Sequence, residues 1–192
     1  TLKKTGISEI MIVCGKEHAG HFMNFLGSGK DYGVKLSYAL QHGSGGIAEA
    51  LGLAEDFILP EEQAAVILGD NIFEDHFRDA AENFKNKKGA RIFLKEVADP
   101  QRFGVAETEN GLVKKIVEKP EWPASNCAVV GMYLYNRDVF DKIKRLSPSS
   151  RGELEITDVH NMYAGEGNLS YEFIKGFWSD AGTFDSLAKA ID

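Results

Sequence analysis

Two aspartates are placed where their side chains could hold a metal ion against a phosphate. Asp70 follows the continuous apolar run 66–68 and Gly69. In open α/β sheets, ligands gather at the carboxyl ends of the strands, and carboxylate oxygens are ligands that Mg²⁺ prefers. Alternatively, Asp70 or Asn71 caps a following helix, which the same position would suit. The pattern leaves both interpretations open.

Asp180 is the second acidic candidate. It lies in the glycine-flanked segment Gly-Phe-Trp-Ser-Asp-Ala-Gly-Thr of residues 176–183, just before a predicted helix. Two carboxylates that converge from distant points of the chain could hold Mg²⁺ against the phosphates of a nucleotide. For Asp180 alone, a turn or cap is the better-supported interpretation.

Glu118 and Lys119 end an apolar strand pattern directly before Pro120. A lysine there can neutralise a phosphate, and the carboxylate beside it can accept hydrogen bonds from sugar hydroxyls. An isolated Glu-Lys pair is more often solvated surface charge, so this interpretation needs support from elsewhere.

A glycine-rich loop, residues 41–46, leads into a helical pattern. Its backbone N–H groups could approach a ligand closely, and Gln41, which donates and accepts, could bind the edge of a pyrimidine. The segment is neither a Walker A sequence nor a correctly spaced Rossmann fingerprint. As a phosphate motif it is therefore weak.

The elements that must position these residues alternate between strand and helix in the first half. Apolar periodicity predicts that strands 9–14 and 64–68 are buried on both faces, and that Phe22 and Phe25 are core residues. We predict a single three-layer α/β domain over residues 1–192, whose mixed sheet has helices on both sides and antiparallel additions in its second half. The expected strands are 9–14, 34–40, 64–68, 90–97, 104–108, 112–118, 128–135 and 169–173, with a hairpin turn at 109–111; the expected helices are 1–6, 16–26, 48–59, 77–87, 138–146, 156–163 and 183–191.

Composition excludes several classes of protein. The 192 residues are 43% hydrophobic and 27% charged, as in ordinary globular domains, and the net charge of −7 argues against a nucleic-acid partner. No apolar run approaches the roughly 20 residues that span a bilayer. We therefore expect a cytoplasmic protein with no membrane partner.

The motifs taken together resemble those of the sugar-nucleotide pyrophosphorylases, and among them the short bacterial thymidylyltransferases that act on glucose 1-phosphate. Each segment is weak alone, but the ordered set covers essentially the whole chain. The matching segments are residues 45–50, 68–73, 99–105, 118–120, 131–135, 151–158 and 178–183.

This resemblance implies a Rossmann-like, glycosyltransferase-A-like fold and transfer of a thymidylyl group from dTTP to glucose 1-phosphate. It implies Mg²⁺ on Asp70 and Asp180, with Asp70, Lys119 and Asp180 as catalytic residues, and a possible homo-oligomer. The residues implied to bind the substrates are Gln41 and Gly46 on the thymine, Glu118 on the sugar hydroxyls, Lys119 on the phosphate, and Gly104 and Tyr133 in the same pocket.

One family feature does not occur within these residues. The family signature Leu-Ala-Gly-Gly-x-Gly-Thr-Arg-Leu is not found, so we expect that an N-terminal βα unit of about 30 to 40 residues is missing. Such a unit would supply backbone N–H groups and an arginine to the triphosphate. A UTP- or CTP-dependent enzyme and a non-catalytic sugar-nucleotide binding module remain alternatives.

Overall fold

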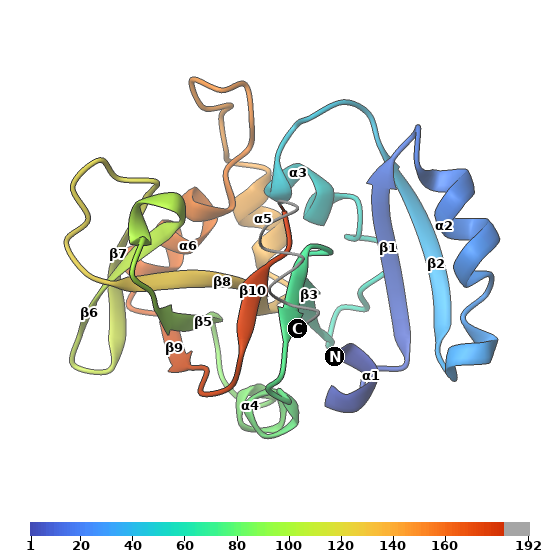
Figure 1. Cartoon of the computed structure of the whole chain (residues 1–192), viewed down its shortest axis with the longest axis horizontal. Coiled ribbons are helices and arrows are strands. Elements are labelled where there is room, and N and C mark those ends of the chain that lie inside the picture. The colour runs from blue at the N-terminus through green and yellow to red at the C-terminus, as the bar shows by residue number, and fades with distance from the viewer. Residues whose placement is uncertain (183–192) are drawn as a thin grey trace.

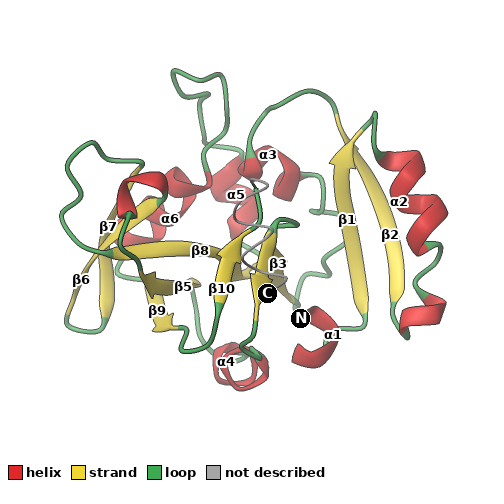
Figure 2. Cartoon of the chain, viewed as in Figure 1, coloured by secondary structure: helices red, strands yellow, loops and turns green. Residues whose placement is uncertain are grey.

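The computed structural model describes residues 1–182, which form three groups of hydrogen-bonded strands with helices around them (Figures 1 and 2). The helix expected over 183–191 lies outside the described residues. Between residues 1 and 182, no helix combines the length and the apolar character needed to cross a bilayer.

A two-stranded parallel sheet forms the first group. β1 (Glu9–Gly15) pairs with β2 (Lys35–Gln41), and α2 (Ala19–Leu26) lies in the connection between them. A 3-10 helix, η1 (Lys30–Tyr32), completes that connection. The short α1 (Leu2–Thr5) precedes β1 and ends at Gly6, as the sequence predicts.

Six strands form the central mixed sheet, in the order β3, β8, β5, β9, β7, β6. Only β5 and β9 pair in parallel; the other neighbours are antiparallel. The predicted hairpin joins β6 to β7, and the positive φ angles of Asn110 (51°) and Gly111 (80°) suit a two-residue turn. The bounds are β3 Gln63–Ile67, β5 Ala90–Glu96, β6 Gly104–Glu109, β7 Leu112–Glu118, β8 Cys127–Asn136 and β9 Leu169–Phe173.

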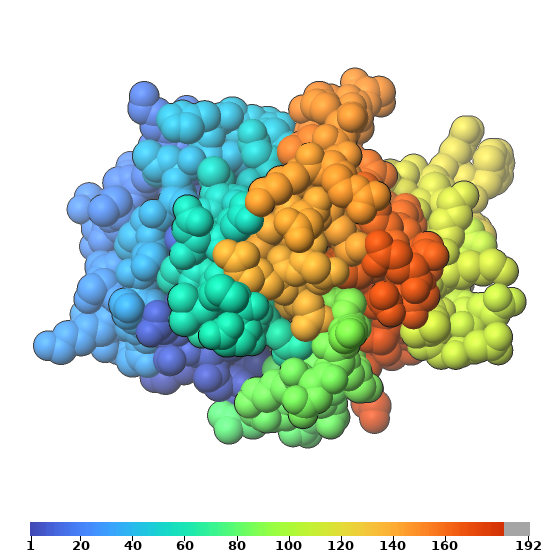
Figure 3. All heavy atoms as spheres, turned by 180° about the vertical axis from the view of Figure 1, so that it is seen from behind, coloured from blue at the N-terminus to red at the C-terminus, as the bar shows by residue number. Residues whose placement is uncertain are grey.

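Helices cover both faces of this sheet, because its strands are apolar on both sides. Along β5, Ile92 faces a core shared with three helices, whereas Phe93 faces a second core on the other side of the sheet. The three helices are α3 (Ile47–Gly52), α5 (Val139–Ile143) and α6 (Ile156–Gly165); Figure 3 shows the side where α3 and α5 adjoin. On the opposite face lies α4 (Arg78–Phe84), and Leu2 of α1 packs against the same core. The predicted three layers are confirmed.

The third group is a three-residue antiparallel pair that periodicity did not predict. β4 (Asn71–Phe73) pairs with β10 (Trp178–Asp180), so that Asn71 lies opposite Asp180. This pair joins segments more than 100 residues apart and brings the two candidate aspartates to one edge of the sheet.

Three sequence expectations are wrong. β1 is half-exposed, because no strand of residues 1–182 covers its second edge. Phe25 on α2 is 79% exposed and Phe22 is 41% exposed, so neither is a core residue. The helix expected over 48–59 ends at Gly52, and turns follow it.

Candidate functional site

A cavity of about 390 Å³ brings together most of the candidate residues. It lies where β3 and β7 end, beside the middle of β8 and the start of α6. Elements from the whole second half of the chain contribute to its wall. The candidates that line it are Asp70, Gly104, Glu118, Lys119, Tyr133 and Asp180.

The β4–β10 pair sets the positions of the two aspartates. The backbone N–H of Ala181 donates to the carbonyl of Asp70 over 2.6 Å, directly beside Asp180. A strand follows Asp70, and the next helix begins only at Arg78. The capping interpretation of Asp70 and Asn71 is therefore wrong, since neither precedes a helix.

Asn71 fixes the orientation of Asp70, a role that the sequence analysis missed. Its Nδ2 donates to Asp70 Oδ1 over 2.8 Å. Its Oδ1 accepts from the Gly131 N–H at 2.9 Å and from Trp178 Nε1 at 2.7 Å. A side chain on Gly131 would collide with the Asn71 amide, since a Cβ there would lie 2.7 Å from it. One amide thus ties Asp70 to β8 and β10.

Arg102 supplies a positive charge beside the aspartates. It lies in η2 (Pro100–Arg102), and its guanidinium donates to Asp99 at 3.0 Å and to Asp180 at 3.1 Å. Hydrogen bonding to Asp99 and the charge of Asp180 raise the pKa of Arg102 above its ordinary value. Because the side chain is 46% exposed, we expect these ion pairs to orient Asp180 and to contribute little stability.

Glu118 is held in place, so its interpretation as solvated surface charge is wrong. The carboxylate is half-buried and accepts a hydrogen bond from Thr157 Oγ1 of α6 at 2.7 Å. Gly104 lies opposite Glu118 in the β6–β7 ladder. A Cβ on Gly104 would lie 3.2 Å from Glu118 Oε2, so the glycine keeps the space beside this carboxylate open.

Lys119 has an unusual backbone. Its φ of 44° places a non-glycine residue in the left-handed region, which costs about 1–2 kcal/mol. A hydrogen bond from its N–H to the Phe103 carbonyl at 2.9 Å holds this conformation. The side chain is exposed at the cavity wall. Strain of this kind is concentrated at functional positions.

Buried aromatic groups form the floor of the cavity. Tyr133 is 4% exposed, and burial, with the charges of Glu118 and Asp70, raises the pKa of its hydroxyl far above the ordinary value. Its ring meets His160 edge-on at 4.8 Å between centroids. His160 Nε2 and the Tyr135 hydroxyl are 2.5 Å apart, and burial lowers the pKa of His160 to about 3. The imidazole is therefore neutral at ordinary pH.

This neutral histidine makes stability depend on pH. Between pH 6.5 and about 3, the unfolded chain binds a proton at His160 that the folded chain excludes. The free energy of unfolding should therefore fall with acidification by about 1.4 kcal/mol per pH unit from this group alone. The free energy of unfolding, measured with urea at several values between pH 7 and 4.5, should depend less steeply on pH in His160→Gln. This variant keeps a hydrogen-bonding partner for Tyr135. Equal slopes would contradict the assignment.

A second arginine stands at the mouth of the cavity. Arg151 Nη2 donates to both carboxylate oxygens of Glu155, at 3.0 and 2.8 Å. Burial alone would raise the pKa of Glu155, but hydrogen bonds from Arg151 and Ser149 lower it overall. Both side chains line the cavity. In the sequence, Arg151 and Glu155 both lie in the matching segment 151–158, but the resemblance assigned no role to either residue.

Gln41 and Gly46 line a neighbouring, larger cavity of about 1360 Å³. Ile47, Leu68 and Glu153 line both cavities, which therefore adjoin. Gln41 Nε2 donates to the Gly46 carbonyl at 3.0 Å and to Glu49 Oε2 at 2.6 Å. Gly46 has a φ of 92°, and a Cβ there would lie 2.5 Å from the Leu154 carbonyl, so this position requires glycine.

The carboxylates of the smaller cavity can be compared with what a divalent cation requires. Within residues 1–182, no three His, Cys, Asp or Glu side chains gather as a metal site. Mg²⁺ is usually held by one or two carboxylates together with water and substrate phosphates. Asp70 and Asp180, both lining the smaller cavity, fit that requirement.

Known proteins are similar to this chain over nearly all of its length. The model of the nucleotidyl transferase family matches residues 1–192. A glucose-1-phosphate thymidylyltransferase of Neisseria meningitidis is 39% identical over 98% of this chain and 67% of its own length. The low-salt glycan biosynthesis nucleotidyltransferase Agl11 of Haloferax volcanii is 39% identical over 98% of this chain and 54% of its own length. The chain thus spans between about half and two thirds of the length of these relatives.

Solved structures share the fold. A Bacillus anthracis protein, provisionally described as a glucose-1-phosphate thymidylyltransferase and crystallised with sucrose, is 52% identical, with a TM-score of 0.93 over 98% of this chain and 77% of that one. A UDP-glucose pyrophosphorylase bound to UDP-glucose is 26% identical, with a TM-score of 0.83 over 98% of this chain and 81% of that one. The expected fold and the resemblance are confirmed, and the chain belongs to the nucleotidyl transferase family.

Proposed function

We propose that the protein transfers the thymidylyl group of dTTP to glucose 1-phosphate, giving dTDP-glucose and pyrophosphate. The observation that carries this proposal is the convergence of Asp70, Asp180, Glu118 and Lys119 on one cavity of about 390 Å³. A sugar phosphate and a nucleoside triphosphate together require groups of these kinds. The two aspartates can hold a metal ion, the glutamate can accept hydrogen bonds, and the lysine carries a positive charge. The names of the relatives support the same reaction.

The sugar phosphate binds where β6 begins and β7 ends. Glu118, oriented by Thr157, accepts hydrogen bonds from sugar hydroxyls. Lys119 contacts the phosphate with its ammonium group. Gly104 leaves room for the sugar ring, and Tyr133 forms the floor beneath it.

Asp70 and Asp180 would hold Mg²⁺, which would supply charge neutralisation for the triphosphate. Asn71 orients the first carboxylate and Arg102 the second. Both interactions are made by the chain alone, so the two aspartates are oriented before any substrate arrives.

The reaction needs positioning more than proton transfer. An oxygen of glucose 1-phosphate is already an anion, and it attacks the α-phosphorus of dTTP in line. The bond from that phosphorus to the bridging oxygen breaks, and its electron pair leaves with pyrophosphate. Lys119 offsets the repulsion between the two anions, and Arg102 and Arg151 add positive charge at the wall. No general base is required.

The base binds beside Gln41 and Gly46 in the adjoining cavity. Gln41 Nε2 already donates to the Gly46 carbonyl and to Glu49. The Oε1 atom of the same amide can therefore accept a hydrogen bond from a nucleobase. An acceptor suits the N3–H of thymine or uracil, whereas cytosine presents an acceptor at N3.

Gln41→Ala should therefore weaken the preference for dTTP over dCTP by about tenfold, the value of one hydrogen bond. The preference for dTTP over UTP should change little, because both bases carry N3–H. Competition between nucleotides, measured as kcat/KM, tests this, and Gln101→Ala serves as an exposed control. An unchanged preference in Gln41→Ala would remove Gln41 from the base site.

A UTP-dependent reaction is the second candidate, favoured by the similarity to a UDP-glucose pyrophosphorylase bound to UDP-glucose. Isothermal titration of the protein with dTDP-glucose, UDP-glucose and CDP-glucose separates the bases. Pyrophosphate release from each nucleoside triphosphate with glucose 1-phosphate then tests turnover. Tightest binding and fastest turnover with the thymidine compounds are expected. Binding without turnover under any condition would instead indicate a non-catalytic binding module.

A further inference from the structure

The segment that leads into β10 has an irregular backbone whose polar groups are all hydrogen-bonded. Residues 175–177 lie between β9 and β10, outside any helix or strand. Backbone N–H and C=O groups need partners when they are removed from water, and an irregular segment cannot supply its own. Here the partners come from the two residues that directly follow β4 and from Lys95 near the end of β5.

Two carboxylates accept the three N–H groups of this segment. Asp75 Oδ2 accepts from the Gly176 N–H at 2.6 Å, and Asp75 Oδ1 accepts from the Lys175 N–H at 3.4 Å. Glu74 Oε2 accepts from the Phe177 N–H at 2.8 Å. Consecutive N–H groups can form an anion-binding concavity, and hydrogen bonds to a charged acceptor are stronger than neutral ones. In this protein, two acids of the chain itself bind there.

Lys95 and the backbone of Glu74 bind the three carbonyl groups of the segment. Lys95 Nζ donates to the carbonyl of Gly176 at 2.8 Å and to that of Lys175 at 3.3 Å. The Glu74 N–H donates to the Phe177 carbonyl at 3.0 Å. All six backbone polar groups of residues 175–177 therefore have a partner, and charged side chains supply five of the six.

Gly176 allows the carboxylates to come this close to the backbone. A Cβ at this position would lie 2.7 Å from Asp75 Oδ2 and 3.0 Å from Glu74 Oε2. Any larger residue would therefore displace the Asp75 carboxylate from the N–H groups that it binds.

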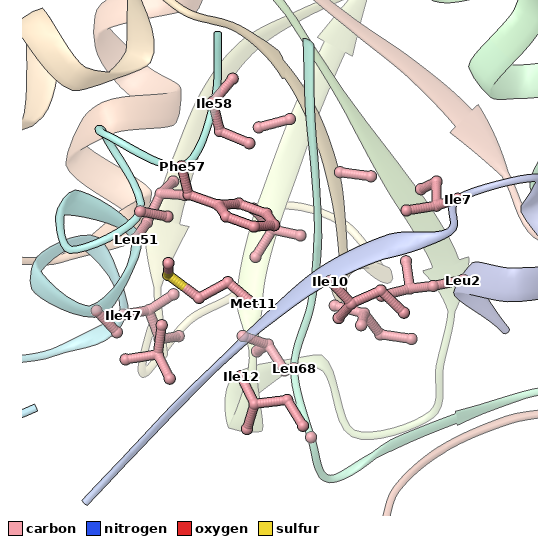
Figure 4. A pocket seen from close by; sticks show the side chains of 18 of the residues that line it. Leu2, Ile7, Ile10, Met11, Ile12, Ile47, Leu51, Phe57, Ile58 and Leu68 are labelled. Carbon is pink, nitrogen blue, oxygen red and sulfur yellow. The ribbon is translucent and has the colours of Figure 1, made fainter. Parts of the chain in front are cut away.

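None of the three charged side chains lines either cavity. Figure 4 shows the apolar wall of the larger cavity, and other residues line the smaller one as well. Glu74, Asp75 and Lys95 therefore do not touch a substrate bound in these cavities, and they can affect it only through the segment that they hold. That segment continues directly into β10, whose Trp178 and Asp180 both line the smaller cavity.

The register of β10 decides which way Asp180 points. Alternate residues of a strand face opposite sides, so Trp178 and Asp180 share the side of the smaller cavity, which Ser179 does not line. A shift of one residue against β4 would turn Asp180 away. Only three residue pairs of the ladder itself oppose such a shift. The hydrogen bonds to residues 175–177 add to them, because the same shift would move every N–H group away from its carboxylate.

We propose that Glu74 and Asp75 are positioning residues. By holding residues 175–177 in one register, they place Asp180 beside Asp70. Both acids directly follow β4 and the segment directly precedes β10, so these contacts close one end of the β4–β10 pair. The expected effect on Mg²⁺ rests on the proposed function, whereas the placement of Asp180 does not.

The fluorescence of Trp178 tests the placement of β10 without metal or substrate. The chain has two tryptophans, and Trp122→Phe removes the other one, which is 85% exposed. In this background, Asp75→Ala should raise the acrylamide quenching constant of Trp178 at least about twofold, because β10 is held less firmly. Asp56→Ala removes an exposed acid elsewhere and should leave quenching unchanged. Unchanged quenching in Asp75→Ala would overturn the proposal.

Two further variants keep the test decisive if Asp75→Ala does not fold. Asp75→Asn keeps one acceptor oxygen for the Gly176 N–H but turns a donor toward Lys175, so quenching should rise by less than in Asp75→Ala. Lys95→Met leaves both carboxylates in place and removes only the bonds to the carbonyls, so it should also raise quenching. If neither variant changed quenching, other contacts would hold the segment and the proposal would be wrong.

Cation binding and turnover test the step from Asp75 to Asp180. Asp75→Ala should weaken the affinity for Mg²⁺, measured by calorimetry, by about tenfold, the value of one hydrogen bond. Turnover at limiting Mg²⁺ should fall by a similar factor, saturating Mg²⁺ should restore it, and KM for glucose 1-phosphate should stay unchanged. A loss of turnover that saturating Mg²⁺ does not restore would indicate a merely structural role and would contradict the proposal.

A double-mutant cycle asks whether Asp75 acts through Asp180. In the Asp180→Asn background, Asp75→Ala should lower the remaining turnover by less than about twofold, since the group that it positions is already lost. A further tenfold loss in that background would rule out this route. If the wild-type protein neither bound Mg²⁺ nor turned over, the proposed function would fail, and Trp178 quenching would still decide whether Asp75 positions β10.

Discussion

Asp70→Asn and Asp180→Asn should each lower the turnover of the active enzyme by about three orders of magnitude, equivalent to about 4 kcal/mol. Each change keeps the shape of the side chain but removes one of the two carboxylates proposed to hold the cation. In Asp70→Asn, the amide oxygen can still accept the hydrogen bond that Asn71 Nδ2 now donates over 2.8 Å, so the orientation of the side chain is kept. Pyrophosphate release at limiting Mg²⁺ and calorimetric titration of the protein with Mg²⁺ alone measure the two effects.

Asp99→Asn is the matched control for Asp180. Asp99 is the other carboxylate that Arg102 contacts, at 3.0 Å, and it does not line the smaller cavity. It should therefore change turnover by less than about fivefold, since exposed ion pairs are worth no more than about 1 kcal/mol. If Asp180→Asn behaved like Asp99→Asn, Asp180 would be a partner of Arg102 and not a metal ligand.

Lys119→Gly should separate stability from function. Glycine adopts the φ of 44° freely, so this variant should be about 1 kcal/mol more stable than Lys119→Ala, which retains the strain. Both variants lose the ammonium group, so kcat/KM for glucose 1-phosphate should fall by about a hundredfold. Chemical denaturation and steady-state kinetics measure the two effects.

Asn110→Gly provides the comparison, because Asn110 has a φ of 51° in the β6–β7 turn, away from the cavity. It should leave the kinetics unchanged, and its gain in stability should be small because asparagine tolerates this conformation. An active Lys119→Gly enzyme with normal affinity for glucose 1-phosphate would show that the strained lysine serves the backbone and not the substrate.

Periodicity predicted the elements that are long and apolar on a regular face. β5, β8 and α6 follow their predicted ranges closely, because their side chains alternate or repeat against the two cores. β4 and β10 have three residues each, too few for any period to be visible. Phe25 is a large apolar residue of the type that is usually buried in a core. The tertiary structure nevertheless decides whether an apolar helix face has a neighbour to pack against.

The candidate site shows the same division. Asp70 was found because it ends an apolar strand, a local signal. Asn71 was missed as a positioning residue because its partners Gly131 and Trp178 lie 60 and 107 residues away. Arg102 contacts Asp180, which lies 78 residues further along the chain. A single sequence does not show which residues so far apart come into contact. Gln41 was found by chemistry, but its engagement with Glu49 depends on the loop conformation.

The β4–β10 pair also determines how the site can be lost. Three residues of β10 contact three of β4, whereas the large core clusters lie under the other strands. A short ladder opens with less free energy than global unfolding requires, and such local openings are visible in native-state hydrogen exchange. Release of β10 would separate Asp180 from Asp70. It would also break the hydrogen bond that the Trp178 indole donates to Asn71. Proteolytic nicking near residue 176 would therefore abolish the proposed cation binding while the six-stranded sheet remained folded.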